Sequence, residues 1–244
     1  LTVGKPLPIN AFTDLLRNEV ARAGYVEMLT HGLCSKADNF TNLRHNVGPA
    51  AELSNPANVE YEVVRTTLLP GALKTLSHNK SISHKDGVKL FEFSDVVIPV
   101  DNEIGCENQR RFCAVYASPN SAFEIIHGLV DRLMTCCQIQ PEAGYAANSM
   151  TTDEYQGQKR VARDGILYSV RPSNDSCFFN GMCAEVVMKY ISENEAKQAG
   201  VTINSEKVVG TFGVVHPEVL NNFEITYPTT VCEIDVEALM HDGF

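Results

Sequence analysis

The sequence predicts an α+β fold, in which an antiparallel or mixed sheet is flanked by helices. Most of the predicted strands follow one another through polar turns, whereas a regular alternation of strands and helices would favour a parallel sheet. The longest predicted strand, 88–100, places Phe91 and Phe93 at alternate positions and then continues as the apolar run 96–98. This pattern indicates that one face of the strand is buried along its first part and that both faces are buried along the apolar run. The 244 residues are expected to form one domain, 1–244, that is long enough to bury a full core.

Three main helices are predicted. In 9–24 the apolar residues recur at helical spacing, and Gly24 fits the end of the helix. In 70–81 the opening proline suits a first helical turn. The segment 121–124 has the Ser-x-x-Glu form of a capping box, and it precedes the apolar stripe of 123–137.

The remaining chain is predicted to consist of strands and loops. Residues 35–58 and 140–164 are polar and interrupted by glycine or proline, so we expect loops there, the first with room for a short helix. His216-Pro217-Glu218 predicts a helix start, because proline suits the first position and an acidic residue suits the helix dipole. The predicted strands are 25–33, 59–65, 88–100, 111–117, 166–170, 182–190, 208–215 and 231–236.

The charge balance disfavours nucleic-acid binding as the main role. The formal net charge is −10, from 30 acidic and 20 basic residues, and such a surface repels phosphate backbones unless basic residues gather locally. Arg110-Arg111 and the group Lys159, Arg160 and Arg163 are the clearest basic clusters, and we expect solvated positions for both. An RNA-binding patch at 159–163 is kept as an alternative.

Composition also limits the cellular setting. No apolar run approaches the roughly 20 residues that span a bilayer, so a membrane protein is excluded. Leu1 stands where an initiator Met would, and no signal segment follows, so we expect a fragment of a longer protein. The eight cysteines form no C-x-x-C pair, which favours reduced, buried thiols in the cytoplasm. The histidines lack metal-ligand spacing, so no metal site is expected.

Three segments carry a family resemblance: 63–73 (VVRTTLLPGAL), 89–97 (KLFEFSDVV) and 210–220 (GTFGVVHPEVL). In this order and spacing they resemble the β subunits of cytosolic, eukaryote-type phenylalanine–tRNA ligases. The similar part is the C-terminal module of those subunits, which has the architecture of a class II synthetase catalytic domain but does not catalyse. The resemblance covers nearly the whole chain and weakens at 144–163 and 192–207.

The resemblance implies a role inside an assembly. In this family, phenylalanine is activated with ATP and transferred to tRNA at a site on the α subunit, where Mg²⁺ accompanies ATP. The resemblance therefore implies a non-catalytic core module that packs against the catalytic α subunit, in a cytoplasmic α2β2 heterotetramer with a second β subunit. Contact with tRNA is implied only for the whole enzyme, and no cofactor is implied in this module.

Arg65 is the residue most in need of an assignment. Catalytic class II relatives carry a similar Arg-Thr segment, in which a guanidinium could hold a carboxylate or a phosphate. The alternative is that Arg65 pairs with a carboxylate beside it in its own chain or caps the turn that follows. An adenylation site also needs a strand arginine, but 89–95 has none and contains Glu92 and Asp95, which would repel triphosphate. No arginine follows Arg171, so the arginine of the third class II motif is missing as well. We therefore expect no catalytic or cofactor-binding residues, with an active ligase that uses unrecognised ATP contacts as the rival hypothesis.

Other reactive residue types have structural explanations. Gly210 and Gly213 match neither glycine-rich nucleotide motif, so close backbone approach within a strand is expected. Cys183 would need a nearby base to act as a nucleophile, and only His127 and His216 are candidates. His127 lies in an apolar helix pattern, which favours a hydrogen-bonded core or interface histidine.

The segment 9–33 resembles motif 1, which builds a subunit interface in class II enzymes. The alternative is a helix that packs only on its own sheet. The helices 9–24 and 123–137 both carry more apolar residues than one buried stripe requires. The predicted interface residues are Ile9, Phe12, Leu15, Leu16, Val20, Ile125 and Leu129.

Overall fold

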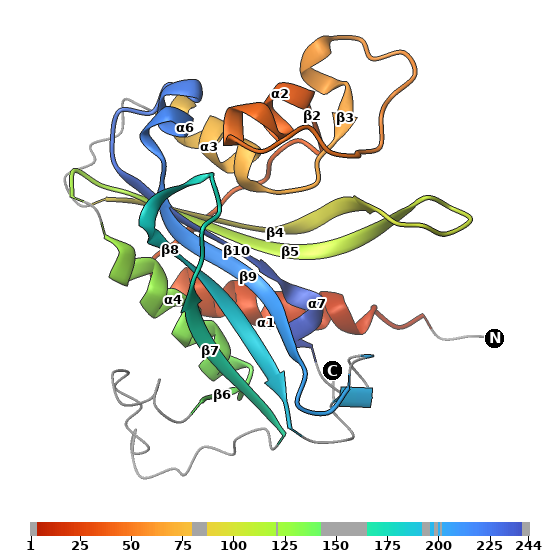
Figure 1. Ribbon diagram of the computed structural model, residues 1–244, viewed down its shortest axis with the longest axis vertical. Coiled ribbons are helices and arrows are strands. Elements are labelled where there is room, and N and C mark those ends of the chain that lie inside the picture. Colours follow the sequence, from red (N-terminus) through yellow and green to blue (C-terminus); the bar gives the residue numbers. More distant parts are fainter. Residues whose placement is uncertain are drawn as a thin grey trace.

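An eight-stranded mixed sheet organises the computed structural model, which describes residues 4–79, 87–120, 122–142, 165–191, 196–197, 200 and 202–240. The strand order is β1-β4-β5-β10-β9-β8-β7-β6, with β1/β4 and β6/β7 parallel and the other neighbours antiparallel (Figure 1). A second sheet pairs β2 with β3. The predicted α+β fold with a mixed sheet is therefore confirmed. The strands are β1 (Val26–Glu27), β2 (Leu33–Cys34), β3 (Val63–Val64), β4 (Val88–Pro99), β5 (Cys106–Ala117), β6 (Gln140–Pro141), β7 (Ile166–Pro172), β8 (Phe178–Tyr190), β9 (Glu206–Val215) and β10 (Thr229–Asp235).

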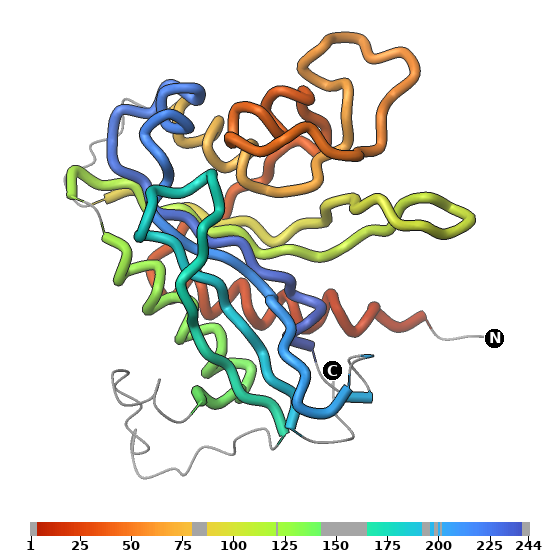
Figure 2. Tube along the Cα trace, viewed as in Figure 1, coloured from red at the N-terminus to blue at the C-terminus, as the bar shows by residue number. Residues whose placement is uncertain are grey.

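Helices cover both faces of the large sheet. Figures 1 and 2 show α1, α4 and α7 on one face, and α2, α3 and α6 on the other. Each face has its own buried cluster of hydrophobic side chains. In β4, Phe91 and Phe93 belong to the cluster on the α1/α4 side, and Val88 and Val96 belong to the cluster on the α3 side. The alternation read from the sequence of this strand thus reflects two cores. The helices are α1 (Pro8–Arg22), α2 (Lys36–Asn39), the 3-10 helices η1 (Thr41–Leu43) and η2 (Val59–Tyr61), α3 (Leu69–His78), α4 (Phe123–Cys136), α6 (Pro217–Asn222) and α7 (Val236–Leu239).

The predicted helices are confirmed, with one difference at a helix start. The helix α4 has Ala122 as its N-cap, with no side-chain cap at this residue, and the capping box predicted from Ser121 falls on a residue outside the described ones. By contrast, α6 begins as expected, because His216 Nδ1 accepts a hydrogen bond from the Glu218 N–H at 3.2 Å.

Two predicted strands are shorter than the sequence indicates. The segment 25–33 splits into β1 and β2, since the chain leaves the large sheet after β1 and Thr30 binds Glu92 instead of continuing the ladder. The segment 59–65 becomes η2 followed by β3. Within the predicted loop 140–164, the first two residues form β6 and residues 143–164 lie outside the described part.

The strand β10, near the end of the sequence, occupies the middle of the sheet. It pairs with β5 from Thr229↔Ala117 to Asp235↔Arg111 and with β9 from Thr230↔Val214 to Ile234↔Gly210. It therefore joins the half of the sheet formed by β1, β4 and β5 to the half formed by β6–β9.

Candidate functional site

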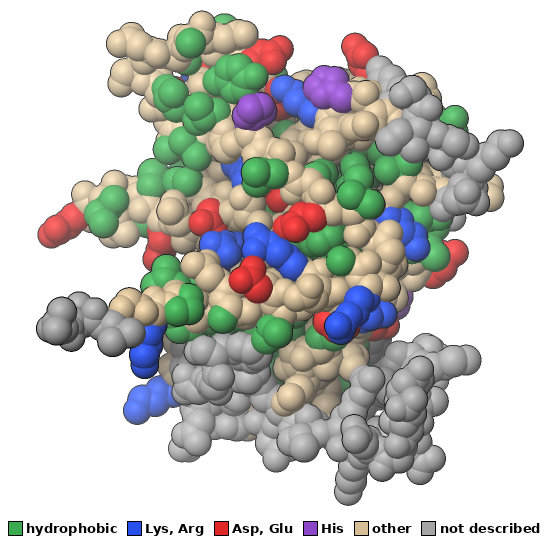
Figure 3. Space-filling model, turned by 180° about the vertical axis from the view of Figure 1, so that it is seen from behind, with side chains coloured by type: hydrophobic (Ala, Val, Ile, Leu, Met, Phe, Trp, Pro, Cys, Tyr) green, Lys and Arg blue, Asp and Glu red, His purple; other side chains and the backbone are tan. Residues whose placement is uncertain are grey.

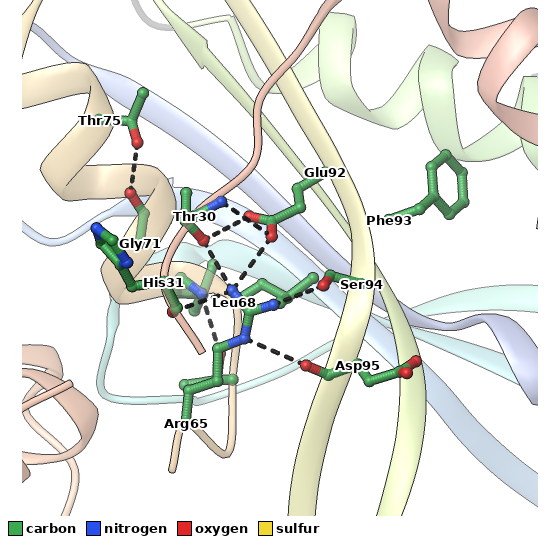
Figure 4. A network of polar contacts seen from close by, with 12 residues as sticks. Thr30, His31, Arg65, Leu68, Gly71, Thr75, Glu92, Phe93, Ser94 and Asp95 are labelled. Carbon is green, nitrogen blue, oxygen red and sulfur yellow. Dashed lines mark hydrogen bonds and ion pairs between the residues drawn. The ribbon is translucent and has the colours of Figure 1, made fainter. Parts of the chain in front are cut away.

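Arg65 lies at the centre of a buried polar network between β4 and the α3 layer (Figure 4). Its Nη1 donates to Thr30 Oγ1 at 2.7 Å and to Glu92 Oε1 at 3.2 Å. Its Nη2 donates to Ser94 Oγ at 2.7 Å, and its Nε donates to the Asp95 carbonyl oxygen at 3.2 Å. The Thr30 hydroxyl in turn donates to Glu92 Oε2 at 2.6 Å. The guanidinium is thus held on every side by its own chain.

The ion pair in this network is almost completely removed from water. The side chains of Arg65 and Glu92 are 6% and 1% exposed. Buried charges persist only when they are paired and hydrogen-bonded, and both conditions are met here. The prediction that Arg65 pairs with a carboxylate of its own chain is confirmed. Glu92, which the sequence suggested as a repellent of triphosphate, is that carboxylate.

A second carboxylate secures the helix that follows. Glu233, on β10, accepts a hydrogen bond from the Leu68 N–H at 2.7 Å and another from the Thr67 hydroxyl at 2.7 Å. A negative group at a helix start satisfies free N–H groups and suits the helix dipole. Sequence analysis did not single out Glu233. Its only signal in the sequence is an acidic residue within the otherwise largely apolar strand pattern of 231–236.

These contacts do not suit the adenylation chemistry of a class II enzyme. The one arginine at this position is already neutralised, and both acidic groups beside it are engaged with protein donors. A triphosphate would need unpaired cations aimed at it. Arg65 is therefore not available to a triphosphate, because its charge is already paired with Glu92.

The remaining candidate reactive groups are also structural. Cys183 is 6% exposed, and burial raises its pKa to about 11, which disfavours the thiolate needed by a nucleophile. His127 is half-buried and stacks on Phe212 with ring centroids 5.3 Å apart, which supports its prediction as a core histidine. A Cβ at Gly213 would lie 2.6 Å from the Met182 carbonyl oxygen, so the close backbone approach predicted at this glycine is confirmed.

Among the described residues, no group of three or more His, Cys, Asp or Glu side chains could hold a metal ion. None of the described helices is both long enough and apolar enough to cross a membrane. All eight cysteines are free thiols, six of them buried, as expected.

The two basic clusters have different outcomes. Arg110 is not solvated as predicted, because its side chain is 16% exposed and pairs with Asp95 across the β4–β5 ladder. The cluster at 159–163 lies outside the described residues.

The seven predicted interface residues divide into two groups. Phe12, Leu16, Val20 and Leu129 are buried in the core of this chain, which corrects their assignment to an exposed surface. They lie on the helix stripes that face the sheet and the neighbouring helix. The others remain available to a partner: Leu15 is 52% exposed, Ile125 is 38% exposed, and Ile9 is half-buried at the edge of the core. Subunit contact through these three stays a prediction.

Comparison with known proteins decides the family. Residues 1–236 match the model of the phenylalanyl tRNA synthetase beta chain CLM domain. The chain belongs to this family. The cytoplasmic phenylalanine–tRNA ligase beta subunit of Arabidopsis thaliana is 37% identical over 97% of this chain and 35% of its own length. The beta subunits of Homo sapiens and Schizosaccharomyces pombe are 37% and 38% identical, over 96% and 97% of this chain and 34% and 36% of their own lengths. The chain thus spans about a third of these relatives.

Proposed function

We propose that this chain is the non-catalytic core module of a phenylalanine–tRNA ligase β subunit. It packs against the catalytic α subunit of a cytoplasmic α2β2 enzyme, which charges tRNA with phenylalanine using ATP and Mg²⁺ bound on the α subunit. The observation that carries the proposal is the family match over 1–236. The self-contained pairing of Arg65 with Glu92 supports the absence of catalysis in this module.

The proposed architecture is one class II synthetase-like domain over 1–244. Two features support it: a long helix, α1, leads directly into an edge strand, β1, and a long antiparallel pair, β4 and β5, follows later in the chain. The first is the place of motif 1 in that class, and the second is the place of the strand pair that carries the strand arginine in its catalytic members. The α3 and α1/α4 cores share the same sheet, which supports a single domain.

The proposed contact with the α subunit lies along α1 and β1. Leu15 and Val26 are 52% and 64% exposed, and β1 is the edge strand of the large sheet. Beside them Arg17 pairs with Asp14 and Glu27, each at 2.7 Å. Figure 3 shows acidic and basic side chains grouped across the middle of this face, with hydrophobic side chains among them. Apolar centres with a polar surround are typical of protein interfaces.

The catalytic part of the proposal is tested by ATP–pyrophosphate exchange with phenylalanine. We expect none above background for this chain alone, and robust exchange once the α subunit is present in complex with the full β subunit. Exchange by the isolated chain would support the rival hypothesis, an active ligase domain with unrecognised ATP contacts.

The assembly part is tested by substitution at the proposed interface. Leu15→Asp in the full β subunit is expected to leave its melting temperature unchanged and to weaken co-purification with the α subunit. Val47→Asp, at a position 63% exposed in a different part of the chain, is the matched control. If both variants assemble as well as the wild type, the α1 surface is not the interface.

The tRNA-binding alternative is kept for the basic cluster at 159–163. It predicts a steep salt dependence of tRNA binding that disappears when Lys159, Arg160 and Arg163 are neutralised. The net charge of −10 weighs against it as the main role.

A further inference from the structure

A large cavity opens on the α3 side of the molecule, and Arg65 of the buried ion pair forms part of its wall. It has a volume of about 860 Å³ and lies between the connection from β1 to β2, the helix η2 and the outer face of α3. Pockets for small-molecule ligands commonly have volumes of roughly 300–1,000 Å³. In Figure 3, histidine, basic and hydrophobic side chains gather at the top of the molecule, over this part of the chain.

Three exposed apolar side chains line this cavity. Leu29 is 89% exposed, Val59 is 68% exposed and Tyr61 is 38% exposed, although they come from two separate segments. Single exposed apolar residues are normal, but several around one hollow indicate a binding surface.

One wall of the cavity is aromatic and held in place. The rings of His31 and Tyr61 meet edge to face, with centroids 5.7 Å apart and an angle of 73° between their planes. The His31 carbonyl oxygen also accepts from Arg65 Nη1 at 3.4 Å, which ties the residue to the buried network. A rigid aromatic side chain beside a hollow is a typical anchor for a partner, because little side-chain entropy is lost on binding.

The charges around the cavity favour a basic occupant. Its lining carries three carboxylates, those of Asp38, Glu60 and Glu224, against two cations, those of Lys74 and Arg65. Arg65 is already neutralised by Glu92 behind the wall, and Lys74 Nζ lies 2.6 Å from Asp38 Oδ2. The cavity therefore has a negative balance, which opposes phosphates and attracts lysine or arginine.

We propose that this cleft binds an extended segment of the α subunit that carries an apolar side chain beside a lysine or arginine. The inference rests on the proposed function, since it names a second contact in the same assembly. Continuity supports the choice of partner: Leu29 follows β1 after one residue, so the cleft adjoins the α1/β1 surface already assigned to the α subunit. The apolar side chain packs against Leu29 and Tyr61, and the basic group lies towards Glu60.

Photo-crosslinking in the assembled enzyme tests this directly. The full β subunit is made with p-benzoylphenylalanine in place of Tyr61, purified with the α subunit and irradiated, and the joined peptides are identified by mass spectrometry. We expect a crosslink to one α-subunit segment with a lysine or arginine nearby. The same photoreactive residue at Val47, which does not line the cleft, is expected not to reach that segment.

Two substitutions give an independent measurement. Tyr61→Ala and Glu60→Lys are each expected to raise the dissociation constant of the complex about tenfold, as loss of an anchor or reversal of a charge does at an interface. Glu107→Lys, a charge reversal on β5 outside the cleft, is expected to change it less than twofold. Melting temperatures exclude misfolding as the cause.

The outcomes separate this inference from the proposed function. If α and β assemble but position 61 crosslinks only within β or not at all, and the two variants bind normally, the cleft assignment is overturned and the proposed function stands. If the wild-type subunits do not assemble, both are overturned.

Discussion

Replacing Glu92 by glutamine would test whether the buried ion pair holds the β4 and α3 layers together. The amide of Glu92→Gln keeps the shape of the side chain and can still accept from Thr30, but it no longer balances Arg65. The guanidinium would then be a buried cation, 6% exposed, without a carboxylate. The neutral contacts of Arg65 to Thr30, to Ser94 and to backbone carbonyls would remain.

The expected loss follows from this burial. Removing one partner of a buried ion pair costs about 3–5 kcal/mol, because the other charge stays desolvated. For a domain of this size, each kcal/mol lowers the melting temperature by roughly 2–4 °C, so we expect a decrease of roughly 6–20 °C. Replacing both charged partners, as in Arg65→Met with Glu92→Met, is expected to cost less than the sum of the single changes.

Urea unfolding of the wild type, Arg65→Met, Glu92→Met and the double variant measures these free energies as a double-mutant cycle. The free energy of unfolding of Glu92→Gln is measured in the same way. Glu206→Gln is the control, since its partner Arg171 lies at 3.3 Å but the two side chains are 51% and 49% exposed. An exposed pair of this kind contributes less than about 1 kcal/mol. If Glu92→Gln is no more destabilising than Glu206→Gln, the network does not hold the two layers together.

Three further predictions concern separate parts of the molecule. His45 Nε2 lies 2.8 Å from Asp175 Oδ1, and this pairing raises the pKa of the histidine and lowers the pKa of the carboxyl. The His45→Asn variant should therefore lose the full stabilisation of this pair between the ordinary pKa values of the two groups, about 4 and 6.5. Its difference from wild type in free energy of unfolding should decline as the pH rises through the raised histidine pKa or falls through the lowered carboxyl pKa. A difference that does not vary with pH would refute this. Gly71→Ala should lower the urea midpoint despite the better helix propensity of alanine, because a Cβ there would lie 2.7 Å from the Thr30 Cβ. By contrast, a Cβ at Gly128 in α4 would meet no atom within 4 Å, so Gly128→Ala should raise the urea midpoint. Leu129→Asp should unfold the chain, as it places a charge at a position 4% exposed, and a folded variant by circular dichroism would contradict the core assignment.

Long periodic segments were predictable because their burial pattern is local. The alternation in 88–100 and the stripe in 123–137 each record which side faces a core, and both elements form where expected. The connection 25–33 could not be predicted in the same way. Its β-branched and aromatic residues favour a strand, but the hydrogen bonds of Thr30 go to a carboxylate 62 residues away. Tertiary contacts decided its path.

The candidate site shows the same division. The residue type needed beside Arg65 followed from the cost of burying a lone charge, so a carboxylate partner was predictable. Its identity was not, because Glu92 and Glu233 come near the segment 65–68 only through the register of β4 and β10. The sequence also could not show which of the predicted interface residues are exposed, because amphipathic spacing does not distinguish a buried stripe from a flanking apolar residue such as Leu15.

The central place of β10 has a consequence for how the molecule is made. During synthesis β5 is complete more than a hundred residues before β10 leaves the ribosome, and β9 also precedes it. Until then both strands present open edges with unpaired backbone groups, the feature that natural sheets hide to avoid aggregation. The sheet can close only when residues 229–235 insert between its two halves. A premature stop between Val215 and Thr229 would leave both halves of the sheet with open edges and without the strand that joins them.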